Sequence, residues 1–219
     1  MKFSKSLITT AILGFSLASF HYTAWADTPN QQFQQGLEAT ERGDYQTAFK
    51  LWLPLAEQGD ASAQFNLGLM YNKGQGVKQN DVEAVKWYRK AAEQGDAKAQ
   101  FNLGNMYTKG RGIKQDDVEA VKWYRQAAEQ GDADAQANLG SAYSKGRGVR
   151  QDYAEAVELF KKAAENGSAD GQFKLGLVYL IGRGIQKDRT LAKEWLGKAC
   201  DNGVQKGCEY YGQLNRGEL

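Results

Sequence analysis

Gln64-Phe65-Asn66-Leu67-Gly68 returns as Gln100-Phe101-Asn102-Leu103-Gly104, 36 residues further along the chain. The pattern appears twice more, as Gln136-Ala137-Asn138-Leu139-Gly140 and Gln172-Phe173-Lys174-Leu175-Gly176, with no insertion or deletion between copies. A fixed period of roughly 20–50 residues is typical of stacked arrays, in which each unit buries its apolar side chains only against its neighbours. Because such arrays usually serve as binding surfaces, the period favours binding over catalysis.

Polar caps and glycines divide each unit into two helices. In the first unit Asp60 precedes a helix expected at 61–73, and Gly74 is placed to end it in the left-handed conformation. Asn80 then opens a second helix, with Glu83 at the spacing of a capping box. Apolar side chains recur along both helices at steps of three and four. The sequence therefore predicts an all-α fold, an α-solenoid of antiparallel helix pairs.

Residues outside the four full units predict three more helices, giving eleven. One pair is expected at 31–42 and 45–58, where Pro54 should kink or interrupt the second helix, and a last helix follows Gly203. The predicted organisation is a single repeat domain over 27–219. It comprises an N-terminal pair at 27–58, full units at 59–94, 95–130, 131–166 and 167–202, and a C-terminal capping helix and tail at 203–219.

The first 26 residues have the composition of a signal peptide. Lys2 and Lys5 precede a mostly apolar run at 7–20, and Ala24-Trp25-Ala26 has the form of a signal peptidase site. The run is shorter than the about 20 residues that span a bilayer, which favours a cleaved peptide over a membrane anchor. We therefore expect cleavage at about Ala26 and a periplasmic or secreted mature chain without membrane insertion.

Cleavage changes the charge and the chemistry of the chain. Loss of Lys2 and Lys5 takes Lys+Arg from 28 to 26 against 26 Asp+Glu, so the formal charge falls from +2 to zero. A neutral chain carries no electrostatic footprint for nucleic acid. The single histidine, His21, would also be removed, and with it the commonest general base and zinc ligand. We expect no catalytic residue, no metal and no cofactor.

The repeated signature resembles a known family. It consists of three parts: Ala-x-Ala-Gln-x-Asn-Leu-Gly-x-Met-Tyr, then Gly-x-Gly-Val, then Ala-x-x-Trp-Tyr-x-Lys-Ala-Ala-Glu. This signature is similar to the Sel-one-like repeat, a relative of the tetratricopeptide repeat. Residues 61–93 and 97–129 match almost throughout, and 133–165 and 169–201 match with departures. Residues 27–58 look more like an ordinary tetratricopeptide unit. The resemblance implies a right-handed superhelix in which the first helix of each unit lines a concave groove. It also implies an adaptor that holds other proteins, as family members typically do, and bacterial members are often periplasmic.

Cys200 and Cys208 are the only cysteines. An even count in an exported chain suggests a bridge, and regular stacking places this pair at facing positions near a tight turn. The arrangement is similar to that of the cysteine-rich branch known from Helicobacter, where every unit carries it. We expect a disulfide that fixes the terminal helix. Its contribution to the free energy of unfolding should be less than the ~3 kcal/mol expected for a disulfide that closes a 15-residue loop.

A second stripe of the first helices points away from the core, and the resemblance implies that it faces the groove. Asparagines there can pair with the amides of an extended peptide, and lysines attract a carboxylate. Alternatively, the asparagines bind neighbouring backbone and fix the stacking; the sequence leaves both open. The candidate partner-binding residues are Asn66, Lys73, Lys98, Asn102, Asn105, Lys109, Asp134, Asn138, Lys145 and Lys174.

Differences among the repeats concern the choice of partner. The repeats differ among themselves at Asn105, Asp134, Ala137, Asp170 and Lys174, and discrimination between partners requires such differences. The Gly-x-Gly loops carry one arginine each in three units, and these are expected to form a solvated row: Arg111, Arg147 and Arg183.

The leading prediction is an exported scaffold that binds a peptide or protein partner in its concave groove. One alternative is a protein that binds a peptidoglycan fragment or a β-lactam, because some cysteine-rich relatives are described as β-lactamase-like. No Ser-x-x-Lys or Lys-Thr-Gly occurs in the chain, so that activity lacks its serine machinery. A second alternative is a periplasmic neutralising partner of a secreted toxin.

Overall fold

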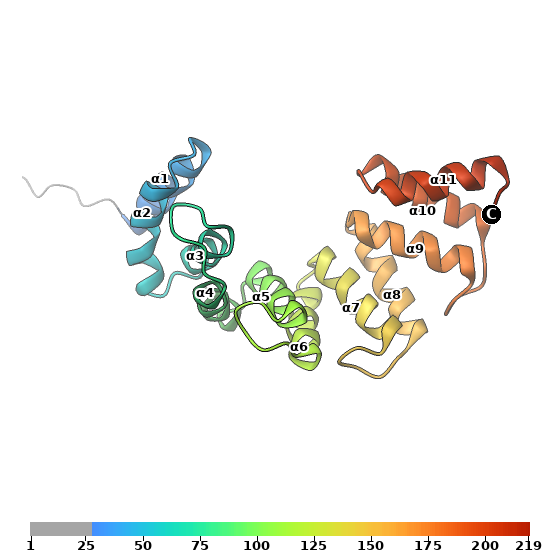
Figure 1. Cartoon of the computed structure of the whole chain (residues 1–219), viewed down its shortest axis with the longest axis horizontal. Coiled ribbons are helices and arrows are strands. Elements are labelled where there is room, and N and C mark those ends of the chain that lie inside the picture. Colours follow the sequence, from blue (N-terminus) through green and yellow to red (C-terminus); the bar gives the residue numbers. More distant parts are fainter. Residues whose placement is uncertain (1–27) are drawn as a thin grey trace, which may run out of the picture.

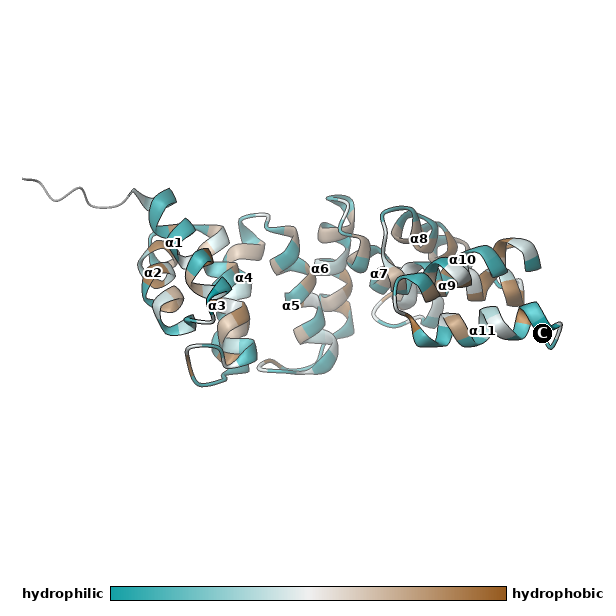
Figure 2. Cartoon of the chain, turned by 90° about the horizontal axis from the view of Figure 1, so that it is seen from above, coloured by the Kyte–Doolittle hydropathy of each residue, from teal (hydrophilic) through white to brown (hydrophobic). Residues whose placement is uncertain are grey.

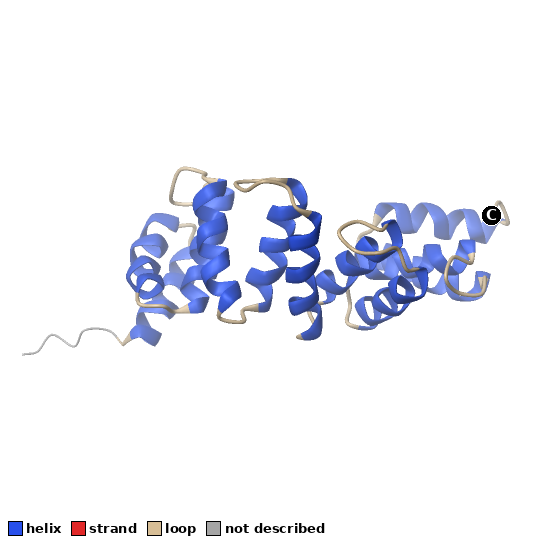
Figure 3. Ribbon diagram, turned by 90° about the horizontal axis from the view of Figure 1, so that it is seen from below, coloured by secondary structure: helices blue, strands red, loops and turns tan. Residues whose placement is uncertain are grey.

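The computed structural model describes residues 28–219, and the predicted signal peptide lies outside them. Within that range the chain forms eleven helices and no strand (Figure 3), as predicted. They are α1 (Pro29–Glu41), α2 (Tyr45–Glu57), α3 (Ala61–Lys73), α4 (Asp81–Glu93), α5 (Ala97–Lys109), α6 (Asp117–Glu129), α7 (Ala133–Lys145), α8 (Tyr153–Glu165), α9 (Ala169–Ile181), α10 (Arg189–Asp201) and α11 (Gln205–Arg216).

The helices stack in chain order into an elongated, bent array with α1 and α11 at opposite ends (Figure 1). Each helix packs against the next one along the chain, and α7 also contacts α9 directly. The predicted α-solenoid is therefore confirmed. The direct α7–α9 contact shows that the first helices of the third and fourth units approach one another, so residues on these two helices can form one surface.

Helix boundaries follow the predicted caps. Asp60 Oδ1 accepts the Ala63 amide at 2.7 Å, and Gly74 ends α3 with φ of 70°. Asn80 caps α4 by accepting the amide of Glu83 at 3.2 Å. The Glu83 side chain binds Lys86 at 3.2 Å rather than the Asn80 amide, so only half of the predicted capping box forms.

Pro54 does not interrupt its helix, so of the predicted kink or interruption the interruption is wrong. It lies inside α2, which continues to Glu57. Proline removes one backbone donor and crowds the preceding turn. Because Pro54 is the tenth of thirteen residues, only the final turn of the helix follows it.

The core is a series of clusters at the junctions between helices rather than one central mass. Leu67 and Leu103 are fully buried, and each belongs to a different cluster. Gly68 lets α3 and α4 come close, because a Cβ on it would overlap the ring of Tyr88. Hydrophobic and hydrophilic segments alternate along the helices (Figure 2).

Buried glutamines bind successive units together. Gln100 Nε2 donates to the Ala92 carbonyl at 3.1 Å, and Gln100 Oε1 accepts from Gln130 Nε2 at 2.8 Å. The same pair of bonds occurs at Gln64, Gln136 and Gln172. We call this arrangement the glutamine clasp. It explains why each copy of the repeated stretch begins with Gln, a function that the sequence analysis did not recognise.

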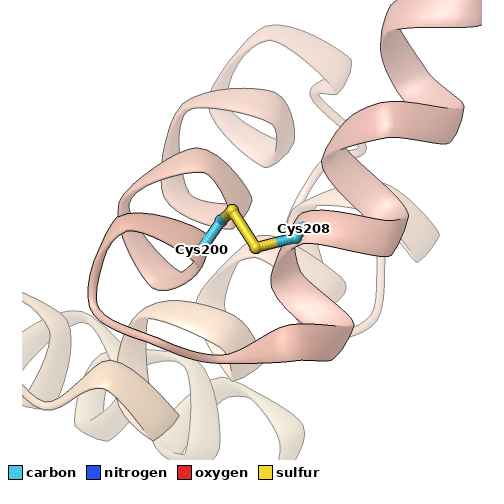
Figure 4. The surroundings of a disulfide bond; sticks show 2 residues. All are labelled: Cys200 and Cys208. Atoms are coloured by element: carbon cyan, nitrogen blue, oxygen red, sulfur yellow. A yellow bond between two sulfur atoms is a disulfide. The ribbon is translucent and has the colours of Figure 1, made fainter.

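The predicted disulfide joins Cys200 at the end of α10 to Cys208 in the first turn of α11 (Figure 4), with Cα atoms 4.5 Å apart. These cysteines occupy the repeat positions of Ala92 and Gln100. At the last junction a covalent bond thus takes the place of the clasp.

The arginines of the Gly-x-Gly loops remain accessible to solvent, as predicted, but each also contacts the preceding unit, which the prediction missed. Arg147 Nη2 contacts Asp117 Oδ1 at 2.8 Å, and the same contact recurs between Arg111 and Asp81. Both acidic residues belong to the preceding unit. For Arg183 of the fourth unit, the position equivalent to these acidic residues is Tyr153 of the third unit, and Arg183 lies over its ring, 5.2 Å from the centroid. Each loop therefore contacts the helix pair before it.

Candidate functional site

A hollow of about 350 Å³ opens between α5, α6 and α7, with α9 at its edge. Half of the candidate groove residues line it: Asn105, Lys109, Asn138, Lys145 and Lys174. They come from the first helices of three consecutive units. We call this cavity the central hollow.

One side of the central hollow is a hydrogen-bonded group around Tyr124. The Tyr124 hydroxyl donates to Asn105 Oδ1 at 2.7 Å, and Asn138 Nδ2 donates to the same oxygen at 3.2 Å. The Thr108 hydroxyl lies 3.1 Å from the Tyr124 hydroxyl. Burial raises the pKa of Tyr124 above its ordinary value, so the phenol stays protonated and able to donate. This group holds α5, α6 and α7 together.

The charges at the rim are of two kinds. Arg147 is paired with Asp117, and Lys174 forms an ion pair with Asp170. Lys109 and Lys145 are exposed and have no acidic partner among residues 28–219. The central hollow therefore presents two unpaired positive charges beside amide and hydroxyl groups.

The remaining candidate residues lie elsewhere. Asn66 and Lys73 line a second hollow of about 380 Å³ together with residues of the N-terminal pair. Asn102 Nδ2 donates at 2.8 Å to the carbonyl of Lys98 in its own helix. Asp134 accepts the Ser168 hydroxyl of the next unit at 2.8 Å. Only half of the predicted residues are thus brought together.

Sequence reasoning missed Tyr124, Thr108 and Ala142 as lining residues of the central hollow. Tyr124 reads as a core aromatic, since Tyr88 occupies the same position in the preceding unit. Ala142 stands where the two preceding units carry Met70 and Met106, but Met70 also lines a hollow, so this difference does not mark the site.

Residues 28–219 contain no cluster of His, Cys, Asp or Glu that could hold a metal ion. The described helices are all too short or too polar to cross a bilayer.

The fold defines a helical-repeat scaffold, with a hollow between its first helices. The chain belongs to the Sel1 repeat family: the family model matches residues 33–60, 61–96, 97–132, 133–168 and 169–204. The match at 33–60 includes most of the segment for which we expected an ordinary tetratricopeptide unit.

Three solved structures share this fold to different degrees. A Sel1 repeat protein from Oxalobacter formigenes superposes with a TM-score of 0.80 at 39% identity, covering 85% of this chain and 76% of that one. A protective antigen of uropathogenic Escherichia coli has a TM-score of 0.79 at 38% identity, over 85% of this chain but 41% of its own length. An immunity protein from Pseudomonas aeruginosa, at 16% identity, covers 83% of this chain and 68% of its own with a TM-score of 0.55, and shows the fold alone.

Among curated proteins, the DAP3-binding cell death enhancer 1 of Rattus norvegicus is 46% identical over 48 residues. That match covers 22% of this chain and 9% of the rat protein. The chain therefore spans only a small part of this curated relative.

Proposed function

We propose that this protein is an exported scaffold that binds a peptide or protein partner on the face formed by its first helices, without a cofactor or a catalytic residue. Sel1 repeats typically mediate protein–protein interactions. The observation that carries the proposal is the central hollow, where Asn105, Lys109 and Lys145 of successive first helices converge.

The chemistry of the central hollow suits a polypeptide. Asn105 Oδ1 is occupied by Tyr124 and Asn138, whereas no hydrogen bond to a described residue uses the Asn105 amide nitrogen. That nitrogen can donate to a peptide carbonyl. Lys109 and Lys145 attract carboxylates without first breaking an ion pair. Their 36-residue spacing places one lysine on each of two adjacent first helices, so a ligand lying across the helices meets both.

Export is part of the proposal. The basic start, apolar run and Ala24-Trp25-Ala26 site support a cleaved signal peptide. The disulfide between Cys200 and Cys208 suits an oxidising compartment. Fractionation of the producing cells tests this part: mature chain starting at Asp27 in the periplasm or medium agrees with it, and full-length chain in the cytoplasm contradicts it.

The binding proposal is tested by affinity capture with the mature chain. Replacing Asn102 and Asn105 together by Ala should abolish capture of the partner and leave helicity by circular dichroism intact. A matched control replaces Lys86 and Lys122, both exposed on second helices, by Ala and should capture normally. Loss of helicity in the asparagine variant, or equal capture by both variants, contradicts the proposal.

The alternatives stay predictions with their own tests. Nitrocefin turnover by the purified chain, above the rate of a groove variant, would favour the β-lactamase-like alternative. Retention on purified peptidoglycan would favour binding of a cell-wall fragment. Capture of a toxin whose activity is then blocked would favour a neutralising partner.

A further inference from the structure

The second hollow, beside the N-terminal pair, and the central hollow occupy equivalent places in the repeat. We call the second hollow the N-terminal hollow; residues of α1, α2 and α3 line it, as residues of α5, α6 and α7 line the central hollow. A Cβ on Gly36 of α1 would overlap the ring of Trp52. In the same way, a Cβ on Gly104 of α5 would overlap the ring of Tyr124. These close approaches align the two sets of helices, so the chain itself provides a comparison for the central hollow.

The two hollows differ in charge at aligned positions. Lys73 and Lys145 are the last residues of α3 and α7, and they line the N-terminal and the central hollow respectively. The last residue of the preceding first helix also lines each hollow: it is Glu41 in the N-terminal hollow and Lys109 in the central hollow. Four basic residues and one acidic residue, Asp117, line the central hollow, whereas the N-terminal hollow has one residue of each sign. The central hollow therefore carries an excess of positive charge that its equivalent lacks.

The free hydrogen-bonding groups of the central hollow include three donors. The Ser141 hydroxyl donates to a carbonyl of its own helix at 2.9 Å, and the Tyr124 hydroxyl donates to Asn105 Oδ1. These two hydroxyl protons are thus already used within the fold. Asn105 Nδ2, Lys109 Nζ and Lys145 Nζ form no hydrogen bond with residues 28–219. An ionised carboxylate has acceptors only, so it suits these donors.

The charge of the central hollow exceeds what one carboxylate matches. Lys174 and Arg147 already have acidic partners, which leaves Lys109 and Lys145 unpaired on successive first helices. The whole chain is close to neutral, with a formal charge of +2, so the excess is local to this site. A segment that brings two or more carboxylates would match both lysines, whereas a single chain terminus would match one.

We propose that the central hollow binds an acidic segment of a partner protein, with two or more Asp or Glu side chains held by Lys109, Lys145 and the Asn105 amide. Charge complementarity of this kind steers association and discriminates between partners. This inference rests on the proposed function and deepens it by naming the class of partner. Each lysine also ends its helix, where positive charge stabilises the helix terminus. That role by itself predicts a lower Tm on removal of the lysines and unchanged peptide binding.

The test begins with a random heptapeptide library displayed on phage and selected on the mature chain at low ionic strength. Selected peptides should carry two or more Asp or Glu residues. They are synthesised with acetylated N-termini and amidated C-termini, so that only side chains supply carboxylates, and their dissociation constants are measured by fluorescence anisotropy. Raising the ionic strength from about 0.1 M to about 1 M shortens the screening length from about 10 Å to about 3 Å and should weaken binding. Binding that requires a free C-terminal carboxylate would overturn the assignment to side chains.

Lys109→Glu introduces the residue that the N-terminal pair carries at this position, Glu41, so the variant should fold. It should weaken binding of the selected peptides about tenfold or more, because like charges at an interface repel. Lys109→Gln with Lys145→Gln removes both free charges and should also weaken binding. The matched control is Lys78→Gln with Lys114→Gln, which removes the same net charge. Both control lysines are exposed, lie 36 residues apart and are outside the central hollow, so this variant should bind as the parent chain does.

The outcomes separate this inference from the proposed function. Selected peptides without acidic residues, or peptides that bind the Lys109→Glu variant as tightly as the parent chain, overturn the acidic segment but leave peptide binding by the scaffold in place. Equal weakening by the control variant would show an effect of overall charge and overturn the site. A lower Tm with unchanged peptide binding in the double glutamine variant would assign Lys109 and Lys145 to the helix ends alone. If selection yields no binding peptide, both this inference and peptide binding by the scaffold are wrong.

Discussion

Asn138 donates its side-chain amide to Asn105 Oδ1 across one step of the repeat, at 3.2 Å. The same oxygen accepts the Tyr124 hydroxyl, so Asn105 joins the first helix of one unit to that of the next. Of the two roles left open by the sequence, Asn105 thus has that of fixing the stack, and contact with a partner remains the proposal. Asn102 differs, because its amide binds the carbonyl of Lys98 in its own helix.

Tyr124→Phe and Tyr88→Phe should have different effects on stability. Tyr124→Phe removes the hydroxyl that bonds with Asn105 and Thr108, which should lower the free energy of unfolding by about 0.5–1.5 kcal/mol. The Tyr88 hydroxyl is buried without a hydrogen-bond partner among residues 28–219, so its removal should be neutral or stabilising. Urea unfolding of both variants measures the difference, and equal losses would contradict the hydrogen-bond assignment.

The same two tyrosines predict loss of stability at high pH. Burial raises the pKa of both Tyr88 and Tyr124 above the ordinary value of 10.0. Their folded-state pKa values exceed the unfolded value, so this stabilisation is complete below pH 10 and is lost as the pH rises above it. The Tm should fall above pH 10, and fall less in the double Phe variant. An identical pH profile in that variant would contradict the prediction.

The repeat made the fold predictable because its determinants are local. Asp60, Asn80 and Gly74 act within a few residues of their own position, so the helix ends could be placed from sequence. The central hollow could not be placed in this way, because its lining residues come from α5, α6, α7 and α9, which are far apart in the sequence. The binding of Arg147 to Asp117, 30 residues apart, was missed for the same reason.

Loss of one glutamine clasp should be costly. Gln100→Leu removes the hydrogen bonds to the Ala92 carbonyl and from Gln130 Nε2. The Ala92 carbonyl still accepts the Gly95 amide and Gln130 Nε2 still donates to the Gln126 carbonyl, so the expected cost is that of the lost hydrogen bonds, about 0.5–1.5 kcal/mol each. Gln126→Leu, an exposed position on α6, is the control and should change stability by no more than about 0.5 kcal/mol. Urea unfolding compares them; similar midpoints would show that the clasp contributes little.

The last junction permits a direct exchange of covalent for hydrogen bonding. Cys200→Ala with Cys208→Ala should lower the Tm. The accompanying loss in the free energy of unfolding should be less than the ~3 kcal/mol expected for a disulfide that closes a longer, 15-residue loop. Cys200→Ala with Cys208→Gln restores the residues of the other junctions and should recover part of the loss, because the glutamine can donate to the carbonyl of residue 200. No recovery in thermal unfolding would contradict the equivalence of clasp and disulfide.

The central claim is that a partner lies on the first helices, across the central hollow. A photo-crosslinking amino acid placed at Lys145, at the rim, should form a covalent adduct with the captured partner, identifiable by mass spectrometry. The same group at Lys122, exposed on α6 and outside the central hollow, should form none. An adduct from position 122 with none from position 145 would place the partner on the outer helices and contradict the account.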